Sequence, residues 1–154
     1  MIIDAKRRAD NATRRILIVD DDHDVATALQ EFLKHKHCDS AIFDNGAKGL
    51  QAVKSSHFDV AIVDLVMPDM DGIEIIRAFH QCSPTLPIIL VTGYGFGASH
   101  NLAPNFLGMA AKLGATRCLR KPVQPRQLLD AIEACLVTPA MEGTQHATDG
   151  ALRA

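Results

Sequence analysis

Acidic residues are missing from one long stretch of this chain. No Asp or Glu occurs between Ile75 and Leu129, whereas the same stretch contains Arg77, Lys112, Arg117, Arg120, Lys121 and Arg126. The net charge of the whole chain is -2, so the remainder is strongly acidic. The total charge neither favours nor excludes nucleic acid, but its distribution predicts one basic and one acidic part of the surface.

Clustered cysteines, long apolar runs and a signal peptide are also missing. The cysteines at positions 38, 82, 118 and 135 form neither a CxxC pair nor a group with zinc-ligand spacing, which favours reduced thiols. No apolar run approaches the roughly 18 residues that span a bilayer. The first residues include Lys6, Arg7 and Arg8 but no apolar core of a signal peptide. We therefore expect a cytoplasmic protein that makes no contact with a membrane.

The composition suits one globular domain, since 47% of the 154 residues are hydrophobic. Residues 1–14 are polar and lack periodicity, and the segment 138–154 contains Pro139, Gly143 and Gly150. We expect a flexible leader at 1–14, a folded domain at 15–137 and a disordered tail at 138–154.

Strand-like and helix-like patterns alternate within that domain. The sequence predicts strands at 16–19, which is a short apolar run, and at 60–63, 87–91 and 117–120, with a weaker strand at 40–43. Helices are expected after each, with Val25, Ala28, Leu29, Phe32 and Leu33 on the apolar face of the first, then at 47–54, around 73–79, after Pro104 and at 124–136. This (βα)5 pattern predicts an α/β doubly wound parallel sheet with helices on both faces.

Chemically active side chains follow four of the predicted strands. Asp20, Asp21 and Asp22 follow the first strand, Asp64 the third, Thr92 the fourth and Lys121 the fifth. Because ligands bind at the carboxyl ends of the strands in such sheets, these groups are expected to converge. Any one of them has an ordinary alternative as a cap, turn or solvated residue, and Asp22 or Asp24 is expected to cap the first helix. Their joint occurrence is far more specific.

The expected cluster suits phosphoryl chemistry. Neighbouring carboxylates repel one another, and a divalent cation such as Mg²⁺, which prefers oxygen ligands, removes that penalty. A carboxylate can then attack a phosphoryl group as a covalent nucleophile. An ammonium and a hydroxyl, here from Lys121 and Thr92, are suited to the charge on the phosphoryl oxygens.

With these residues in place, residues 15–136 resemble a response-regulator receiver domain of two-component signalling, of the stand-alone, chemotaxis-regulator-like kind. The resemblance rests on Ile16-Leu17-Ile18-Val19-Asp20-Asp21, on Val63-Asp64-Leu65-Val66-Met67-Pro68-Asp69-Met70-Asp71-Gly72, on Thr92 after a strand, and on Lys121-Pro122. It implies a flavodoxin-like fold with strand order 2-1-3-4-5 and a cis bond before Pro122.

The resemblance also implies residue roles and partners. Asp64 is the phosphoacceptor, Mg²⁺ is bound by Asp20, Asp21, Asp64 and the Val66 backbone carbonyl, and Thr92 and Lys121 bind the phosphoryl group. The donor is a phosphohistidine on a sensor histidine kinase or a histidine phosphotransfer protein. Output passes to another, unknown protein through the surface of the fourth helix, fifth strand and fifth helix. No direct DNA binding is expected, because no output domain fits in the tail.

Two features depart from the family pattern. Cys118 occupies a switch position that is commonly aromatic, and the segment between Thr92 and Gly114 is long and glycine-rich. Within it, residues 93–98 match a GxGxxA dinucleotide motif, but no acidic residue follows at the required distance, so a mobile loop is the favoured interpretation. A metal site at His35 and His37 is weighed against a solvated helix end, which is favoured. Met67 and Met70 are expected to pack rather than to function.

Two other functions remain open at this point. The domain could be a phosphate sink or relay intermediate without an output partner. It could also be a metal-dependent phosphohydrolase with Asp64 as nucleophile, but such enzymes commonly carry a second acid two residues later, where this chain has Val66. We therefore expect a signalling domain that catalyses only its own phosphorylation and dephosphorylation.

Overall fold

The five predicted strands form one parallel sheet. A computed structural model describes residues 13–67, 72–93, 111–112 and 114–137. The sheet order is β2-β1-β3-β4-β5, as predicted, with short strands buried between two helical layers. The strands are β1 (Arg15–Val19), β2 (Asp39–Phe43), β3 (Val60–Asp64), β4 (Ile88–Thr92) and β5 (Arg117–Arg120).

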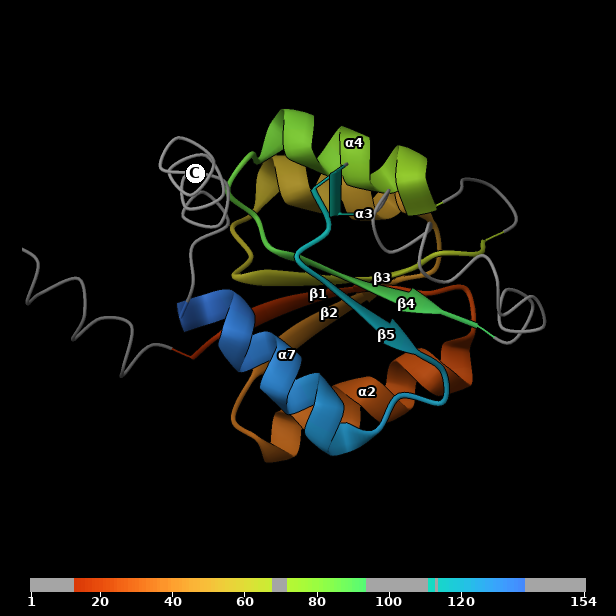
Figure 1. Ribbon diagram of the computed structural model, residues 1–154, viewed down its shortest axis with the longest axis vertical. Coiled ribbons are helices and arrows are strands. Elements are labelled where there is room, and N and C mark those ends of the chain that lie inside the picture. Colours follow the sequence, from red (N-terminus) through yellow and green to blue (C-terminus); the bar gives the residue numbers. More distant parts are fainter. Residues whose placement is uncertain (1–12, 68–71, 94–110, 113, 138–154) are drawn as a thin grey trace, which may run out of the picture.

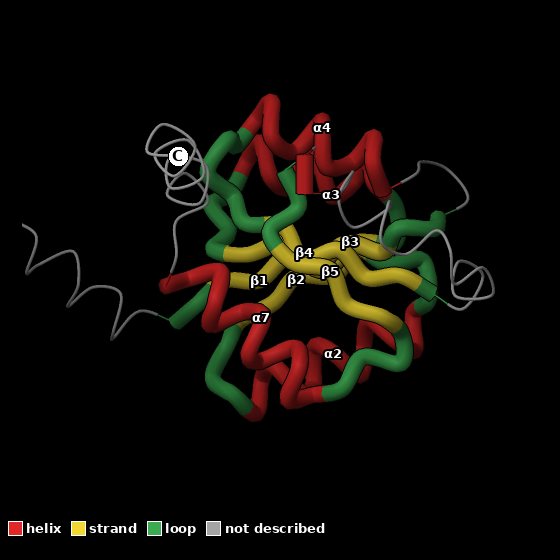
Figure 2. Tube along the Cα trace, in the orientation of Figure 1, coloured by secondary structure: helices red, strands yellow, loops and turns green. Residues whose placement is uncertain are grey.

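Helices cover both faces of the sheet. The described helices are α2 (His23–His35), α3 (Gly46–Ser55), α4 (Gly72–Cys82) and α7 (Pro125–Val137). In Figure 1, α3 and α4 lie above the sheet and α2 and α7 lie below it. Figure 2 shows the strands as a single layer between these two pairs. The arrangement confirms the doubly wound α/β class predicted from the alternating pattern.

Alternation along each strand divides the core into two layers. In β1, Leu17 and Val19 face the layer of α3 and α4, whereas Ile16 and Ile18 face the layer of α2 and α7. All four side chains are fully buried. Burial of such an aliphatic side chain contributes about 1.5–3 kcal/mol relative to exposure. Because both faces of the sheet are covered, the central strands β1, β3 and β4 are nearly continuous apolar runs rather than alternating ones. The edge strands β2 and β5 also contain polar residues and are only partly buried.

The first helix confirms one local prediction and corrects another. Asp22 is its N-cap, and the Asp22 carboxylate accepts from the backbone N–H groups of Asp24 and Val25. The apolar face was assigned one position incorrectly, because Ala26 is buried whereas Ala28 is exposed. Small alanine side chains at neighbouring positions carry too little hydrophobic signal to fix which of them faces the core.

Some predicted features lie outside the described residues. These are most of the leader, the tail at 138–154, Met70, residues 94–98 of the glycine-rich motif, and the helix expected after Pro104 apart from the helical Ala111 and Lys112. Among the described helices, none has the length and apolarity that crossing a bilayer requires.

Candidate functional site: an acidic cluster with one lysine

The strand register brings the polar residues to one edge of the sheet. Val19 of β1 is opposite Val63 of β3, and Asp64 of β3 is opposite Val91 of β4. Thr92 of β4 is in turn opposite Arg120 of β5. Asp20 and Lys121 directly follow β1 and β5, while Asp64 and Thr92 are the last residues of their strands rather than the first residues after them. The predicted convergence at the carboxyl edge is therefore present.

Three carboxylates form the centre of this edge. Asp20, Asp21 and Asp64 each offer an oxygen, and these oxygens all lie within 4.8 Å of one another. Asp20 is 4% exposed and Asp64 is 5% exposed, whereas Asp21 is exposed to solvent. Two buried carboxylates so close together are costly unless a cation compensates them.

Lys121 supplies part of that compensation. Its Nζ lies 3.1 Å from Asp20 Oδ2 and 3.2 Å from Asp64 Oδ2, and the lysine side chain is itself largely buried. One ammonium thus bridges two carboxylates, which leaves the group of Asp20, Asp21 and Asp64 with an excess of negative charge. The Lys121–Pro122 peptide bond is cis, as the resemblance implies.

The pKa values of Asp64 and Lys121 are both raised, but for different reasons. Burial, and secondarily the negative charge of Asp20, raise the pKa of Asp64 to about 6, although Lys121 and the Val66 N–H act in the opposite direction. For Lys121, burial alone would lower the pKa. The hydrogen bonds and charges of Asp20 and Asp64 outweigh that effect and raise the pKa of Lys121.

Backbone N–H groups orient both buried carboxylates. The N–H of Asp22 donates to Asp20 Oδ1 at 2.9 Å, and the N–H of Val66 donates to Asp64 Oδ1 at 3.3 Å. In each carboxylate, Oδ1 therefore accepts a hydrogen bond from the backbone N–H two residues later in the sequence. Oδ2 of the same carboxylate contacts the Lys121 ammonium. Val66 is 51% exposed beside this site.

Thr92 lies at the same edge, but its hydroxyl has another partner. Thr92 Oγ1 donates to the Leu119 carbonyl of β5 at 3.4 Å, a long and hence weak hydrogen bond. Cys118, at the position where an aromatic residue is common, is half-buried and packs against the layer of α3 and α4. Burial raises the pKa of the Cys118 thiol, so this cysteine is not an activated nucleophile.

The donor set fits a hard divalent cation. It consists of carboxylate oxygens alone, two of them buried and one exposed, as Mg²⁺ prefers. Thiol or imidazole ligands, which softer metals select, do not take part in this group. No other cluster of potential metal ligands was found among the residues that the structure describes.

The remaining candidates behave as the ordinary alternatives predicted. His35 and His37 are exposed at the end of α2, and Met67 is buried in the core layer of α3 and α4.

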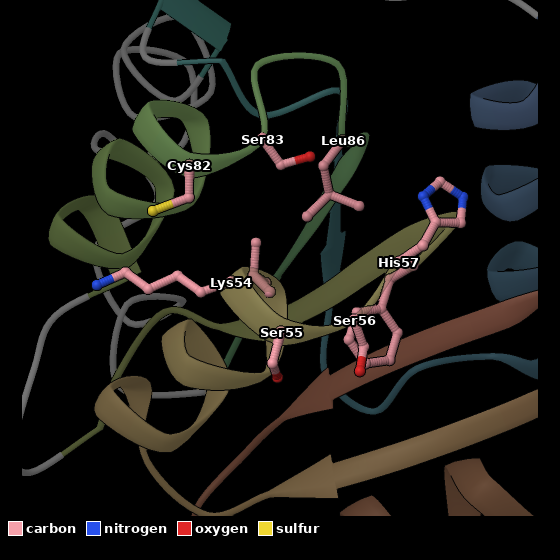
Figure 3. A pocket seen from close by; sticks show the side chains of 9 residues that line it. Lys54, Ser55, Ser56, His57, Cys82, Ser83 and Leu86 are labelled. Carbon is pink, nitrogen blue, oxygen red and sulfur yellow. The ribbon is translucent and has the colours of Figure 1, made fainter.

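A cavity of about 320 Å³ lies away from the acidic cluster, between the ends of α3 and α4. Lys54, His57, Cys82 and Leu86 are among its lining residues (Figure 3). These residues precede β3 and β4, so the cavity is at the amino edge, opposite the acidic cluster.

Sequence reasoning missed one contact of the site. Lys121 was expected only as a partner of the phosphoryl group, whereas the structure places it between Asp20 and Asp64. The usable signal was the position of all three residues at strand ends, because the carboxyl ends of parallel strands meet at one edge of the sheet.

Comparisons with known proteins agree with this geometry. The sequence profile of the response regulator receiver domain matches residues 16–133. Over 124 residues the chain is 32% identical to the response regulator receiver protein CpdR of Brucella abortus, covering 80% of this chain and 98% of that protein. It is 35% identical over 125 residues to the transcriptional regulatory protein GltR of Pseudomonas aeruginosa, covering 80% of this chain but only 49% of GltR.

Solved structures give the same result. A CheY-like receiver domain from Methanospirillum hungatei superimposes with a TM-score of 0.72 at 32% identity, covering 81% of this chain and 94% of that one. The chemotaxis protein CheY4 of Vibrio cholerae also gives a TM-score of 0.72, at 26% identity, with coverage of 81% and 100%. With the sheet order, the acidic cluster and these matches together, the chain belongs to the response regulator receiver domain family of two-component systems.

Proposed function

We propose that this receiver domain accepts a phosphoryl group on Asp64 from a phosphohistidine donor and signals by contact with another protein. The observation that carries the proposal is the arrangement of Asp20, Asp21 and Asp64 within 4.8 Å, with Lys121 Nζ 3.2 Å from Asp64. A buried carboxylate between an oxygen-rich cluster and an ammonium has the groups that a phosphoryl acceptor requires.

Each residue has a distinct proposed role. An oxygen of the Asp64 carboxylate attacks phosphorus, the bond from phosphorus to the donor histidine nitrogen breaks, and that nitrogen keeps the electron pair. Lys121 moves from the carboxylates to the incoming phosphoryl oxygens and offsets their charge. Thr92 exchanges its weak hydrogen bond to the Leu119 carbonyl for one to a phosphoryl oxygen.

Asp20, Asp21, Asp64 and the backbone carbonyl of Val66 are the proposed Mg²⁺ ligands. A divalent cation held by these residues would supply positive charge against the carboxylates and the phosphoryl oxygens. The protein's own contribution is to orient the Asp20 and Asp64 carboxylates through the N–H groups of Asp22 and Val66.

The partners follow from the family and from the charge of the chain. The proposed donor is a sensor histidine kinase or a histidine phosphotransfer protein. All four cysteines are free thiols, which fits the reducing cytoplasm where we place the protein. The downstream protein is proposed to bind near β5, where Arg117 and Arg120 are exposed. GltR is named as a transcriptional regulator, but this chain spans about half of it, and we propose no direct DNA binding.

Two rival functions make different predictions. A phosphate sink or relay would accept the phosphoryl group on Asp64 but bind no output protein in either state. A phosphohydrolase would turn over a phosphate monoester many times, which is disfavoured because the residue two positions after Asp64 is the apolar Val66. The discriminating experiment incubates the protein with a phosphate monoester and Mg²⁺ and counts turnovers per molecule. We expect none beyond a single labelling event, and repeated turnover would favour the hydrolase.

A further inference from the structure

The chain leaves β3 at Asp64, and the first residue of α4 contacts the chain again directly after this strand, at Leu65. Leu65 is buried directly after Asp64, and Gly72, the first residue of α4, is buried against it. The Gly72 N–H donates to the Leu65 carbonyl at 2.8 Å. On its other side, the Leu65 N–H donates to the Val91 carbonyl at 2.8 Å. Leu65 is therefore fixed by hydrogen bonds to a neighbouring strand and to the following helix.

The peptide that Gly72 holds is the one that orients Asp64. The carbonyl of Leu65 and the N–H of Val66 belong to the same planar peptide group. Gly72 binds the carbonyl of this group, and the Val66 N–H donates to Asp64 Oδ1 at 3.3 Å. A rotation of this peptide would change the direction of the N–H and hence the position of the carboxylate.

Only glycine allows this approach. A Cβ at position 72 would lie 2.7 Å from Leu65 Cα, 3.0 Å from Leu65 Cδ1 and 3.1 Å from the Leu65 carbonyl oxygen. Two of these three atoms belong to the backbone, so rotation of a side chain cannot relieve the contact. An added methyl group must displace the peptide between Leu65 and Val66.

We propose that Gly72 is a positioning residue for phosphorylation. Its missing side chain and its N–H together set the peptide that aims the Asp64 carboxylate, and the same peptide leads to the Val66 carbonyl. This inference rests on the proposed function of Asp64 and extends it to a residue outside the group of Asp20, Asp21, Asp64 and Lys121. Gly72 acts through the Leu65–Val66 peptide alone.

Gly49 in α3 offers a matched control. A Cβ at position 49 would lie equally close to a neighbour, 2.7 Å from Val19 Cγ2 and 3.3 Å from the Phe79 ring, but it would meet only side-chain atoms. Gly49→Ala therefore tests crowding in the same core layer without displacing the backbone that follows Asp64.

The experiment compares Gly72→Ala and Gly49→Ala in the full chain, at a temperature where circular dichroism shows both to be folded. Phosphorylation by acetyl phosphate with Mg²⁺ is followed by intact mass, and the Val66 amide chemical shift is recorded by NMR without metal. We expect Gly72→Ala to slow phosphorylation about 10- to 100-fold, since small misplacements of reacting groups have effects of this size. It should also shift the Val66 amide, while Gly49→Ala changes neither.

Equal rates for the two variants, or an unchanged Val66 amide in Gly72→Ala, would overturn the proposal. If Gly72→Ala does not fold, a second variant decides. Replacing Gly72 with glycolic acid substitutes an ester oxygen for the N–H and adds no side chain. This variant should also slow phosphorylation, and a normal rate would overturn the role of Gly72. Failure of the proposed function is recognised separately, because the wild-type protein would then not be labelled on Asp64.

Discussion

Charged side chains are exposed and paired at the amino edge of the sheet, whereas at the carboxyl edge two carboxylates are buried close together. At the amino edge, the Arg15 guanidinium pairs with Asp39 at 3.6 Å, and the backbone N–H of Arg15 donates to the Asp59 carboxylate at 2.8 Å. These side chains are in contact with solvent. At the carboxyl edge, Asp20 and Asp64 are buried, and both carboxylates contact the same ammonium, that of Lys121. Exposed pairs contribute little to stability, typically up to about 1 kcal/mol, whereas buried like charges are costly.

Cavity size and buried charge, taken as two indicators of a functional site, indicate opposite edges of the sheet. The cavity of about 320 Å³ lies at the amino edge, yet its lining includes no carboxylate and no member of the acidic cluster. The carboxyl edge holds the raised pKa of Asp64 and the close carboxylate oxygens. In this molecule, the raised pKa and the close carboxylates therefore indicate the candidate site better than cavity size does, because perturbed pKa values cluster at functional sites.

Two lysines at opposite edges test this comparison most strongly. Lys121→Ala should retain Mg²⁺ binding but slow phosphorylation about 100-fold, because the phosphoryl charge loses its partner. Lys54→Ala, which removes an exposed ammonium beside the cavity, should leave the rate unchanged. Rates are measured by intact mass with a small phosphodonor. A normal rate in Lys121→Ala, or an equal loss in both variants, would contradict the assignment of the carboxyl edge.

The lifetime of the acyl phosphate tests access of water to the same edge. Val66 is exposed beside Asp64, and neither Val66 nor Tyr94, which lies outside the described residues, carries a carboxylate or amide to orient an attacking water. We expect slow self-dephosphorylation. Val66→Asn combined with Tyr94→Glu should shorten the half-life about 10-fold, less than the roughly 100- to 10,000-fold that general acid–base catalysis typically contributes. An unchanged half-life would show that water access is controlled elsewhere.

The pH dependence of stability sharpens the comparison further. Because the pKa of Asp64 is raised from 3.8 to about 6 in the folded protein, the folded state binds this proton more tightly than the unfolded state. The resulting stability is fully present below about pH 4 and is lost as the pH rises through about 6. The full shift corresponds to about 3 kcal/mol at about 1.4 kcal/mol per pKa unit, and solvent screening reduces it because the carboxylate is at the sheet edge. Without metal, Asp64→Asn should therefore increase the free energy of unfolding at pH 7 by about 1 kcal/mol.

This increase should disappear as the pH falls from 6 to 4, when urea denaturation is repeated at each pH. The matched change at the amino edge is Asp59→Asn, which weakens the hydrogen bond from the Arg15 N–H. It should lower stability at pH 7 instead. A stability gain in Asp64→Asn that does not depend on pH would show that the buried charge is not its cause.

The smallest expected effect concerns transmission of the signal. Cys118 has no ring to fill the space that Thr92 leaves, so the hydrogen bond from Thr92 to Leu119 is a direct link to β5. With beryllofluoride, which stands in for the phosphoryl group, hydrogen exchange should change between Gly93 and Leu113 more than in α2 or α3. Most of that segment lies outside the described residues. Unchanged exchange there, with changes elsewhere, would mean that the signal leaves by another route.

The sequence predicts most of the fold because short strand-like segments alternate with segments of helical periodicity, although the apolar face of α2 was misassigned at Ala28. The order of the strands required the resemblance, since periodicity alone does not order parallel strands. The convergence of Asp20, Asp64, Thr92 and Lys121 was predictable from their positions at strand ends. The hydrogen bond between Gly72 and Leu65 was not, because the close approach depends on how α4 packs on β3. The Thr92 hydroxyl likewise has a partner, the Leu119 carbonyl, that only tertiary structure supplies.

The central claim is that Asp64 is the phosphoacceptor, and one measurement tests it most directly. Wild-type protein and Asp64→Asn are each incubated with acetyl phosphate and Mg²⁺, and their intact masses are compared. An amide is a far poorer nucleophile than a carboxylate, so the wild-type protein should gain a single phosphoryl group and Asp64→Asn should gain none. Normal labelling of Asp64→Asn would place the phosphoryl group on another residue and contradict the assignment.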